Sequence, residues 1–155
     1  MTNRPPRPHG FHAWLQVVRC YQKASRRLSD RLAPLALTNA QFDVLANLLA
    51  GPAHGLTQDQ LGQRLLVTKG NVSGLLDRLG ERGLITRRPN PEDGRSKLVQ
   101  LTATGVGLAE QAVQVQRNFI AALMQPLTET DLERLCRILE QVEERLDEQA
   151  DSERP

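Results

Sequence analysis

The sequence predicts a mainly α-helical protein that carries one small β-hairpin. Two observations lead to this fold class. Most of the 155 residues fall into segments in which apolar side chains recur every three or four positions, which is the spacing of one helix face. The stretch 84–101 instead alternates apolar and polar residues on either side of a loop that contains proline and glycine, as two paired strands do. The low aromatic content agrees with a mostly helical chain.

The first predicted elements are a long helix over residues 11–32 and a shorter one that follows it. Pro34 ends the long helix. Thr38 begins the second helix, because it is followed three residues later by Gln41 as in a capping box, and Gly51–Pro52 ends it. The apolar residues of the long helix recur at helical spacing: Phe11, Trp14, Leu15, Val18, Tyr21, Leu28 and Leu32.

A pair of helices joined by a short turn is predicted between residues 57 and 83. Thr57 and Gln60 form a second capping box at the start of the first helix, and Thr68 begins the second. Gly83 ends the pair, because glycine readily adopts the left-handed conformation of a helix C-cap. The residues spaced for burial are Leu61, Leu65 and Leu66, then Val72, Leu75, Leu76 and Leu79.

Two strands, 84–88 and 97–101, follow directly and are joined by the loop 89–96. Helix, turn, helix and a basic hairpin is the arrangement of a winged helix-turn-helix, whose second helix enters the DNA major groove. In a fold of this kind, residues 55–56 are expected to add a short third strand beside the hairpin. The sequence therefore predicts a protein that binds double-stranded DNA.

The candidate DNA-binding residues lie on the polar face of the second helix and on the hairpin. Short polar side chains and cations suit base edges and phosphates, and an arginine at the tip of a hairpin suits the narrow minor groove. The candidates are Thr68, Lys69, Gly70, Asn71, Ser73, Gly74, Arg78, Arg87, Arg88, Asp93, Arg95, Ser96 and Lys97.

Three of these residues have a second interpretation. Gly70 and Gly74 share a helix face, which favours close approach of the backbone to DNA, although tight helix packing would also explain them. Asp93 is expected to orient the guanidinium of Arg95 through a charge-assisted hydrogen bond. The alternative for Asp93 is an ordinary acidic turn residue.

The segment VTKGNVSGLLDRLGERGLITRR, followed by PEDGRSKLVQLTATG, resembles the MarR family of bacterial transcription regulators. The most specific part is Asp93-x-Arg95 followed by Leu101-Thr102-x-x-Gly105. The resemblance covers residues 35–105 closely. It implies a homodimeric regulator, most often a repressor, that binds a pseudo-palindromic operator and is released by a small aromatic or phenolic effector. Trp14 and Asp43 are the candidate residues for an effector cavity; for Trp14 the alternative is a place in the core.

The long terminal helices also favour a homodimer. Thr102 is expected to begin a helix that reaches about Gln125, and Thr128 to begin the last helix. With the first helix, their apolar stripes are longer than a small winged helix needs, so we expect packing against a second copy, with two recognition helices about 34 Å apart. An all-intramolecular bundle is the alternative. The stripe of the last helix comprises Leu132, Leu135, Leu139, Val142 and Leu146.

The expected organisation is a single domain. It comprises a flexible segment 1–10, a helical dimerisation region 11–34 and 106–147, a DNA-binding lobe 35–105 and a flexible tail 148–155. Residues 1–56 carry seven Lys or Arg and two Asp or Glu, whereas residues 103–155 carry five and eleven. A basic half and an acidic tail fit DNA binding at one end of the molecule. With no apolar run of membrane-spanning length and no signal peptide, a cytoplasmic location is expected.

Other functions have weaker support in the sequence. Cys20 and Cys136 are the only cysteines, and buried inert thiols are expected; the alternative is an oxidant-sensing regulator that uses this pair. His9 and His12 lack a further ligand that would complete a zinc site. Because no assembled acid, base, nucleophile or phosphate loop is apparent, the sequence favours neither an enzyme nor a bound cofactor.

Overall fold

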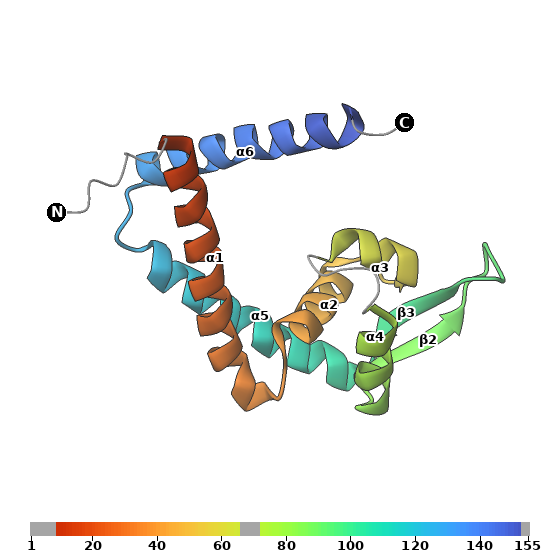
Figure 1. Ribbon diagram of the computed structural model, residues 1–155. Helices are drawn as coiled ribbons and strands as arrows, with labels where there is room; N and C mark the ends of the chain where they lie inside the picture. Colours follow the sequence, from red (N-terminus) through yellow and green to blue (C-terminus); the bar gives the residue numbers. More distant parts are fainter. Residues whose placement is uncertain (1–8, 66–71, 153–155) are drawn as a thin grey trace. The chain divides into compact units, whose positions relative to one another are not determined.

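The computed structural model describes residues 9–65 and 72–152 and shows a mainly helical fold with a three-stranded antiparallel sheet (Figure 1). This confirms the predicted fold class. The chain divides into two compact units, Met1–Gln116 and Arg117–Pro155. The elements are α1 (His9–Leu32), a 3-10 turn η1 (Ala33–Leu35), α2 (Asn39–Ala50), β1 (Leu56–Thr57), α3 (Gln58–Arg64), α4 (Val72–Glu81), β2 (Ile85–Pro89), β3 (Lys97–Leu101), α5 (Ala103–Met124) and α6 (Glu129–Ser152).

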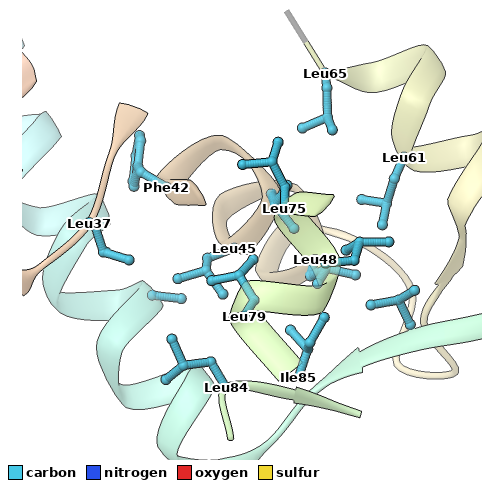
Figure 2. Packing of buried hydrophobic residues seen from close by; sticks show 14 of the residues in the cluster. Leu37, Phe42, Leu45, Leu48, Leu61, Leu65, Leu75, Leu79, Leu84 and Ile85 are labelled. Atoms are coloured by element: carbon cyan, nitrogen blue, oxygen red, sulfur yellow. The ribbon is translucent and has the colours of Figure 1, made fainter. Parts of the chain in front are cut away.

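The core of the first unit consists mainly of leucine and valine side chains from its helices, with Phe42 from α2 and with Ala109 and Ala112 from α5. Leu45, Leu61, Leu76 and Leu79 are fully buried, as is Leu32 at the end of α1. Figure 2 shows Leu45, Leu75 and Leu79 together where α2 faces α4. Each fully buried leucine contributes about 1.5–3 kcal/mol to stability, so this cluster fixes α4 against the rest of the unit.

The predicted helix starts are confirmed by hydrogen bonds. Thr38 and Gln41 form a complete capping box at α2, and Thr57 and Gln60 form another at α3. In each case the Thr hydroxyl accepts from a backbone N–H while the Gln side chain accepts from the Thr N–H. Gly83 has a φ of 67°, which confirms the left-handed end of α4.

The sheet has the order β1–β3–β2, with both pairings antiparallel. The hairpin β2–β3, which we call the wing, pairs Ile85 with Leu101 at its base and Pro89 with Lys97 near its tip. The third strand expected at residues 55–56 is present as β1 at Leu56–Thr57. Gly55, with a φ of 94°, lies against the backbone of Val99, so a side chain there would meet β3.

A junction of hydrogen bonds holds the start of α5 against the end of α4. The Thr102 hydroxyl donates to the Gly83 carbonyl at 2.7 Å, and the Thr102 N–H donates to the Leu84 carbonyl at 3.0 Å. The same hydroxyl accepts from the Gly105 N–H, which caps α5. Gly105 is buried against Leu84, and a Cβ atom there would overlap the Leu84 carbonyl group. These contacts explain why the Thr102-x-x-Gly105 pattern needs threonine and glycine at this spacing.

The second unit comprises the end of α5 and the whole of α6. Thr128 begins α6 as predicted: its hydroxyl accepts from the Asp131 N–H and also hydrogen-bonds to the Asp131 carboxylate. These Thr128 hydrogen bonds lower the pKa of Asp131 below its usual value of 3.8. The apolar stripe of α6 remains exposed in the single chain.

Both terminal segments are more helical than expected. His9 and Gly10 belong to α1 rather than to a flexible segment, because the last proline before the helix is Pro8. At the other end, α6 continues through Ser152 although residues 148–155 were expected to be flexible. This part of α6 contains neither proline nor glycine, and Arg145 pairs with Glu148 one turn later.

Candidate nucleic-acid interface

The described part of the polar face of α4 lies at the surface, as a DNA-reading helix requires. Ser73 and Arg78 are exposed, and Gly74 is half-buried. The opposite face of α4 is buried and consists of Val72, Leu75, Leu76 and Leu79. Four predicted site residues, and the predicted helix start at the first of them, lie outside the described residues: Thr68, Lys69, Gly70 and Asn71.

The tip of the wing is held by its own hydrogen bonds. The Asn90 side-chain amide donates to the Ser96 hydroxyl at 2.9 Å, and that hydroxyl donates to the Asp93 carbonyl. The Ser96 N–H donates to the same carbonyl, and the Glu92 N–H to the Asn90 side chain. The predicted DNA contact Ser96 is therefore engaged within the loop. This network presents Arg95 on a loop of fixed shape.

The predicted role of Asp93 is corrected by these bonds. Its carboxylate accepts from the backbone N–H of Arg95 at 3.0 Å rather than from the guanidinium. Asp93 therefore acts through a turn, the alternative that the sequence left open, because an Asp side chain readily bonds to the N–H two residues on. The exposed Arg95 side chain is placed through the turn and not through an ion pair with Asp93.

An ion pair joins the wing to α4. The Arg87 guanidinium on β2 donates to the Asp77 carboxylate on α4 at 2.7 Å. Both side chains are partly exposed, at 35% for Arg87 and 56% for Asp77. Asp77 was missed by the sequence interpretation, because a separation of ten residues has no periodic signature and the contact depends on how β2 lies beside α4. The pair fixes one wing arginine with respect to the helix.

A groove of about 350 Å³ lies between the wing, the start of α3 and α4. It brings together three predicted cationic residues of the wing, Arg87, Arg95 and Lys97, with Ser73 of α4. The remaining lining residues are Thr57, Gln58, Asp59, Ser96 and Val99. Arg78 and Arg88 are also exposed but lie outside this groove. Converging cations and hydroxyl groups on a concave surface are the chemistry that a phosphate backbone requires.

The other candidate residues lie elsewhere. Trp14 on α1 is 52% exposed, which corrects the alternative that it belongs to the core. Asp43 on α2 is half-buried, and its carboxylate accepts a hydrogen bond from the Asn47 side chain at 3.2 Å. Neither residue lines the groove. The expectation that the cysteines are buried is wrong for the single chain, since Cys20 and Cys136 are both exposed. The apolar stripes of their helices, α1 and α6, are exposed in the single chain. The spacing of apolar residues in the sequence therefore could not show which positions on these helices are buried.

The described residues contain neither a cluster of metal-binding side chains nor a membrane-spanning helix. Among residues 9–65 and 72–152, no group of three or more His, Cys, Asp or Glu side chains is close enough to hold a metal ion. Within the same ranges, no helix is both sufficiently long and sufficiently apolar to span a bilayer.

The chain is similar in sequence and in structure to proteins of one family. Residues 37–96 match the model of the MarR family. The multiple antibiotic resistance protein MarR of Escherichia coli is 36% identical over 122 residues, which are 78% of this chain and 83% of that protein. The crystal structure of a cysteine-to-serine mutant of E. coli MarR complexed with operator DNA is 34% identical, with a TM-score of 0.73 over 86% of this chain and 94% of that one.

A second complex with DNA has the same fold. The Staphylococcus aureus MepR–DNA complex is 25% identical to this chain, with a TM-score of 0.77 over 88% of this chain and 97% of that one. Members of the MarR family are DNA-binding transcription regulators and not enzymes. The chain therefore belongs to the MarR family of winged helix-turn-helix transcription regulators.

Proposed function

We propose that this regulator is a repressor that binds a pseudo-palindromic operator through α4 and the wing. The observation that carries the proposal is the groove in which Arg87, Arg95 and Lys97 meet Ser73 of α4. Cations along the wing would contact phosphates and the minor groove, while the polar residues at the start of the recognition helix would read base edges. The structures of E. coli MarR with operator DNA and of MepR with DNA support this use of the fold.

The proposed binding unit is a homodimer formed by the terminal helices. Apolar side chains that are 39–64% exposed in the single chain occur on α1 and α6, at the spacing of one helix face. Exposed apolar surface on this scale marks an association site in soluble proteins. The residues concerned are Phe11, Trp14, Val17 and Tyr21 on α1, and Leu135, Ile138, Leu139, Val142 and Leu146 on α6. A two-fold dimer would present two recognition helices to one face of a duplex.

The release of DNA by a small aromatic or phenolic effector is the finer part of the proposal. It rests on the family to which the chain belongs. An effector would act by binding more tightly to a dimer whose recognition helices have the wrong spacing, so that the population with the correct spacing falls. Trp14 and Asp43 are the residues proposed to contact it.

Selection of bound sequences from a random DNA library tests the proposal directly. We expect enrichment of a two-fold symmetric site whose half-sites are about one helical turn apart. Sedimentation of the free protein and of the complex then gives the stoichiometry, for which we expect two chains per site. The absence of any enriched sequence, or a site bound by one chain, would contradict the proposal. Adding candidate phenolic acids to the selected complex tests the effector.

The second candidate function is an oxidant-sensing regulator, because both cysteine thiols are exposed. Exposed thiols are accessible to peroxide, and oxidation to a sulfenic acid or a disulfide would alter α1 or α6. A double Cys20→Ser, Cys136→Ser variant separates the two functions. Operator binding that peroxide weakens in the wild type but not in the variant would support sensing, and identical peroxide responses would exclude it.

A further inference from the structure

Three contacts converge on the residues that end the recognition helix. The carbonyls of Gly83 and Leu84 accept from Thr102 at the start of α5. The preceding residue, Arg82, makes the third contact in the opposite direction. Its guanidinium donates to the Ala36 carbonyl at 2.8 Å and to the Leu35 carbonyl at 3.4 Å. The end of α4 is therefore joined both to α5 and to the segment that ends α1.

The acceptors of Arg82 are carbonyls that the end of a helix leaves without helical partners. α1 ends at Leu32 and passes through the 3-10 turn η1 to Ala36, which has a left-handed φ of 52°. The Ala36 and Leu37 N–H groups turn back to the carbonyls of Ala33 and Leu32. The carbonyls of residues 35 and 36 follow this turn and accept from the exposed Arg82 side chain, whose planar guanidinium offers two N–H groups and a positive charge near the negative end of the helix.

We infer that Arg82 is a positioning residue that couples the recognition helix to α1, and that it acts without contacting DNA. The inference rests on the proposed function, in which α1 helps to form the dimer and α4 reads the operator. The Arg82 side chain lies 46 residues from its acceptor in sequence, so it reports the placement of α4 relative to α1 and not local helix geometry. In a dimer, that placement sets the distance and angle between the two recognition helices.

This role predicts a specific pattern of DNA binding for Arg82→Ala. A dimer with loosely held recognition helices loses affinity for a correctly spaced pair of half-sites, because it must restrict that freedom on binding. We expect affinity for the selected paired site to fall about tenfold, within the range found for residues that couple two sites. Affinity for a single half-site and for random DNA should remain that of the wild type. The loss on inserting one base pair between the half-sites should also become smaller.

One further variant and one control keep the test decisive. Arg82→Lys retains the charge and one donor but not the paired geometry, so its loss of affinity should be intermediate; it also serves if Arg82→Ala does not fold. Arg137→Ala on α6 removes an exposed positive charge of the same kind and should bind all these DNAs as the wild type does. Thermal unfolding of each variant at one protein concentration measures any general loss of stability.

The possible results separate the explanations. Reduced affinity for the paired site alone, with relaxed spacing, supports the coupling role. Unchanged paired-site affinity and spacing preference in Arg82→Ala overturns it. Equal losses on every DNA with a flatter salt dependence also overturn it, because they make Arg82 a phosphate contact. If the wild type itself does not prefer paired half-sites, the proposed dimeric function fails, and that result is distinct from a failure of Arg82 alone.

Discussion

Gly105 gives the most precise prediction about stability, because the space around it is closed by backbone. A Cβ atom at this position would overlap the Leu84 carbonyl oxygen and lie 2.9 Å from the carbonyl carbon. An ordinary contact between carbon atoms is about 3.5 Å, so the carbonyl carbon alone requires the start of α5 and residue 84 to move apart by about 0.6 Å, and the nearer carbonyl oxygen requires a larger movement. That movement strains the two hydrogen bonds from Thr102 to the carbonyls of residues 83 and 84.

The cost of Gly105→Ala follows from these contacts. Inserting a methyl group into a closed site costs about 1–3 kcal/mol, and each weakened hydrogen bond adds up to about 1 kcal/mol. The higher helix propensity of alanine offsets about 1 kcal/mol. We therefore expect the free energy of unfolding to fall, by up to about 4 kcal/mol. Urea denaturation followed by circular dichroism at one protein concentration measures this change, since a dimer would make stability depend on concentration.

Gly107→Ala is the matched control for this substitution. Gly107 lies two residues further along α5, and a Cβ atom there would meet nothing within 4 Å. This variant should gain about 0.5–1 kcal/mol from helix propensity. If the two variants were equally stable, the close packing of α5 against residue 84 would not exist in solution, and the explanation given for the Thr102-x-x-Gly105 pattern would be wrong.

Three further changes test other parts of the molecule. Asp77→Ala removes the partner of Arg87 and should lower the free energy of unfolding by less than about 1 kcal/mol, since the pair is exposed. In binding assays, the affinity of this variant for random DNA should rise relative to its affinity for the operator. An unchanged ratio of the two affinities would remove Asp77 from the interface. Asn71→Ala should reduce discrimination between operator and random DNA more than overall affinity, and equal losses on both would make Asn71 a phosphate contact. The pKa of Asp131 is lowered by its hydrogen bonds to Thr128, so its contribution to α6 stability is present above pH 3.8 and is lost as the pH falls through the lowered value. Acid titration of the helix signal should show this loss for the wild type and a smaller one for Thr128→Ala; equal titrations would refute it.

Local signals in the sequence predicted most of the fold. Capping boxes such as Thr38 with Gln41, and the glycine at position 83, act through contacts within a few residues, so their consequences are readable without coordinates. The wing strands were placed to within a residue for the same reason, because alternation and turn residues define them.

Contacts between distant segments could not be predicted in the same way. The Asp77–Arg87 pair and the hydrogen bonds of Arg82 depend on how α4 lies against β2 and against the end of α1, and no spacing rule encodes that packing. The Asp93 carboxylate accepts from the backbone N–H of Arg95 and not from its guanidinium as predicted, because an Asp side chain readily bonds to the N–H two residues on. Burial of Cys20 failed because a helical stripe alone does not show which of its positions the chain covers.

The dependence of DNA affinity on salt concentration tests the central claim that the wing and α4 form the DNA-binding surface. Arg95→Ala removes an exposed cation at the wing tip, and Arg137→Ala removes an exposed cation from α6. In fluorescence anisotropy titrations at several salt concentrations, Arg95→Ala should bind the operator more weakly. Its plot of log affinity against log salt should be flatter by about one unit for each protomer. Arg137→Ala should match the wild type in both respects. Equal slopes and affinities for all three proteins would contradict the claim.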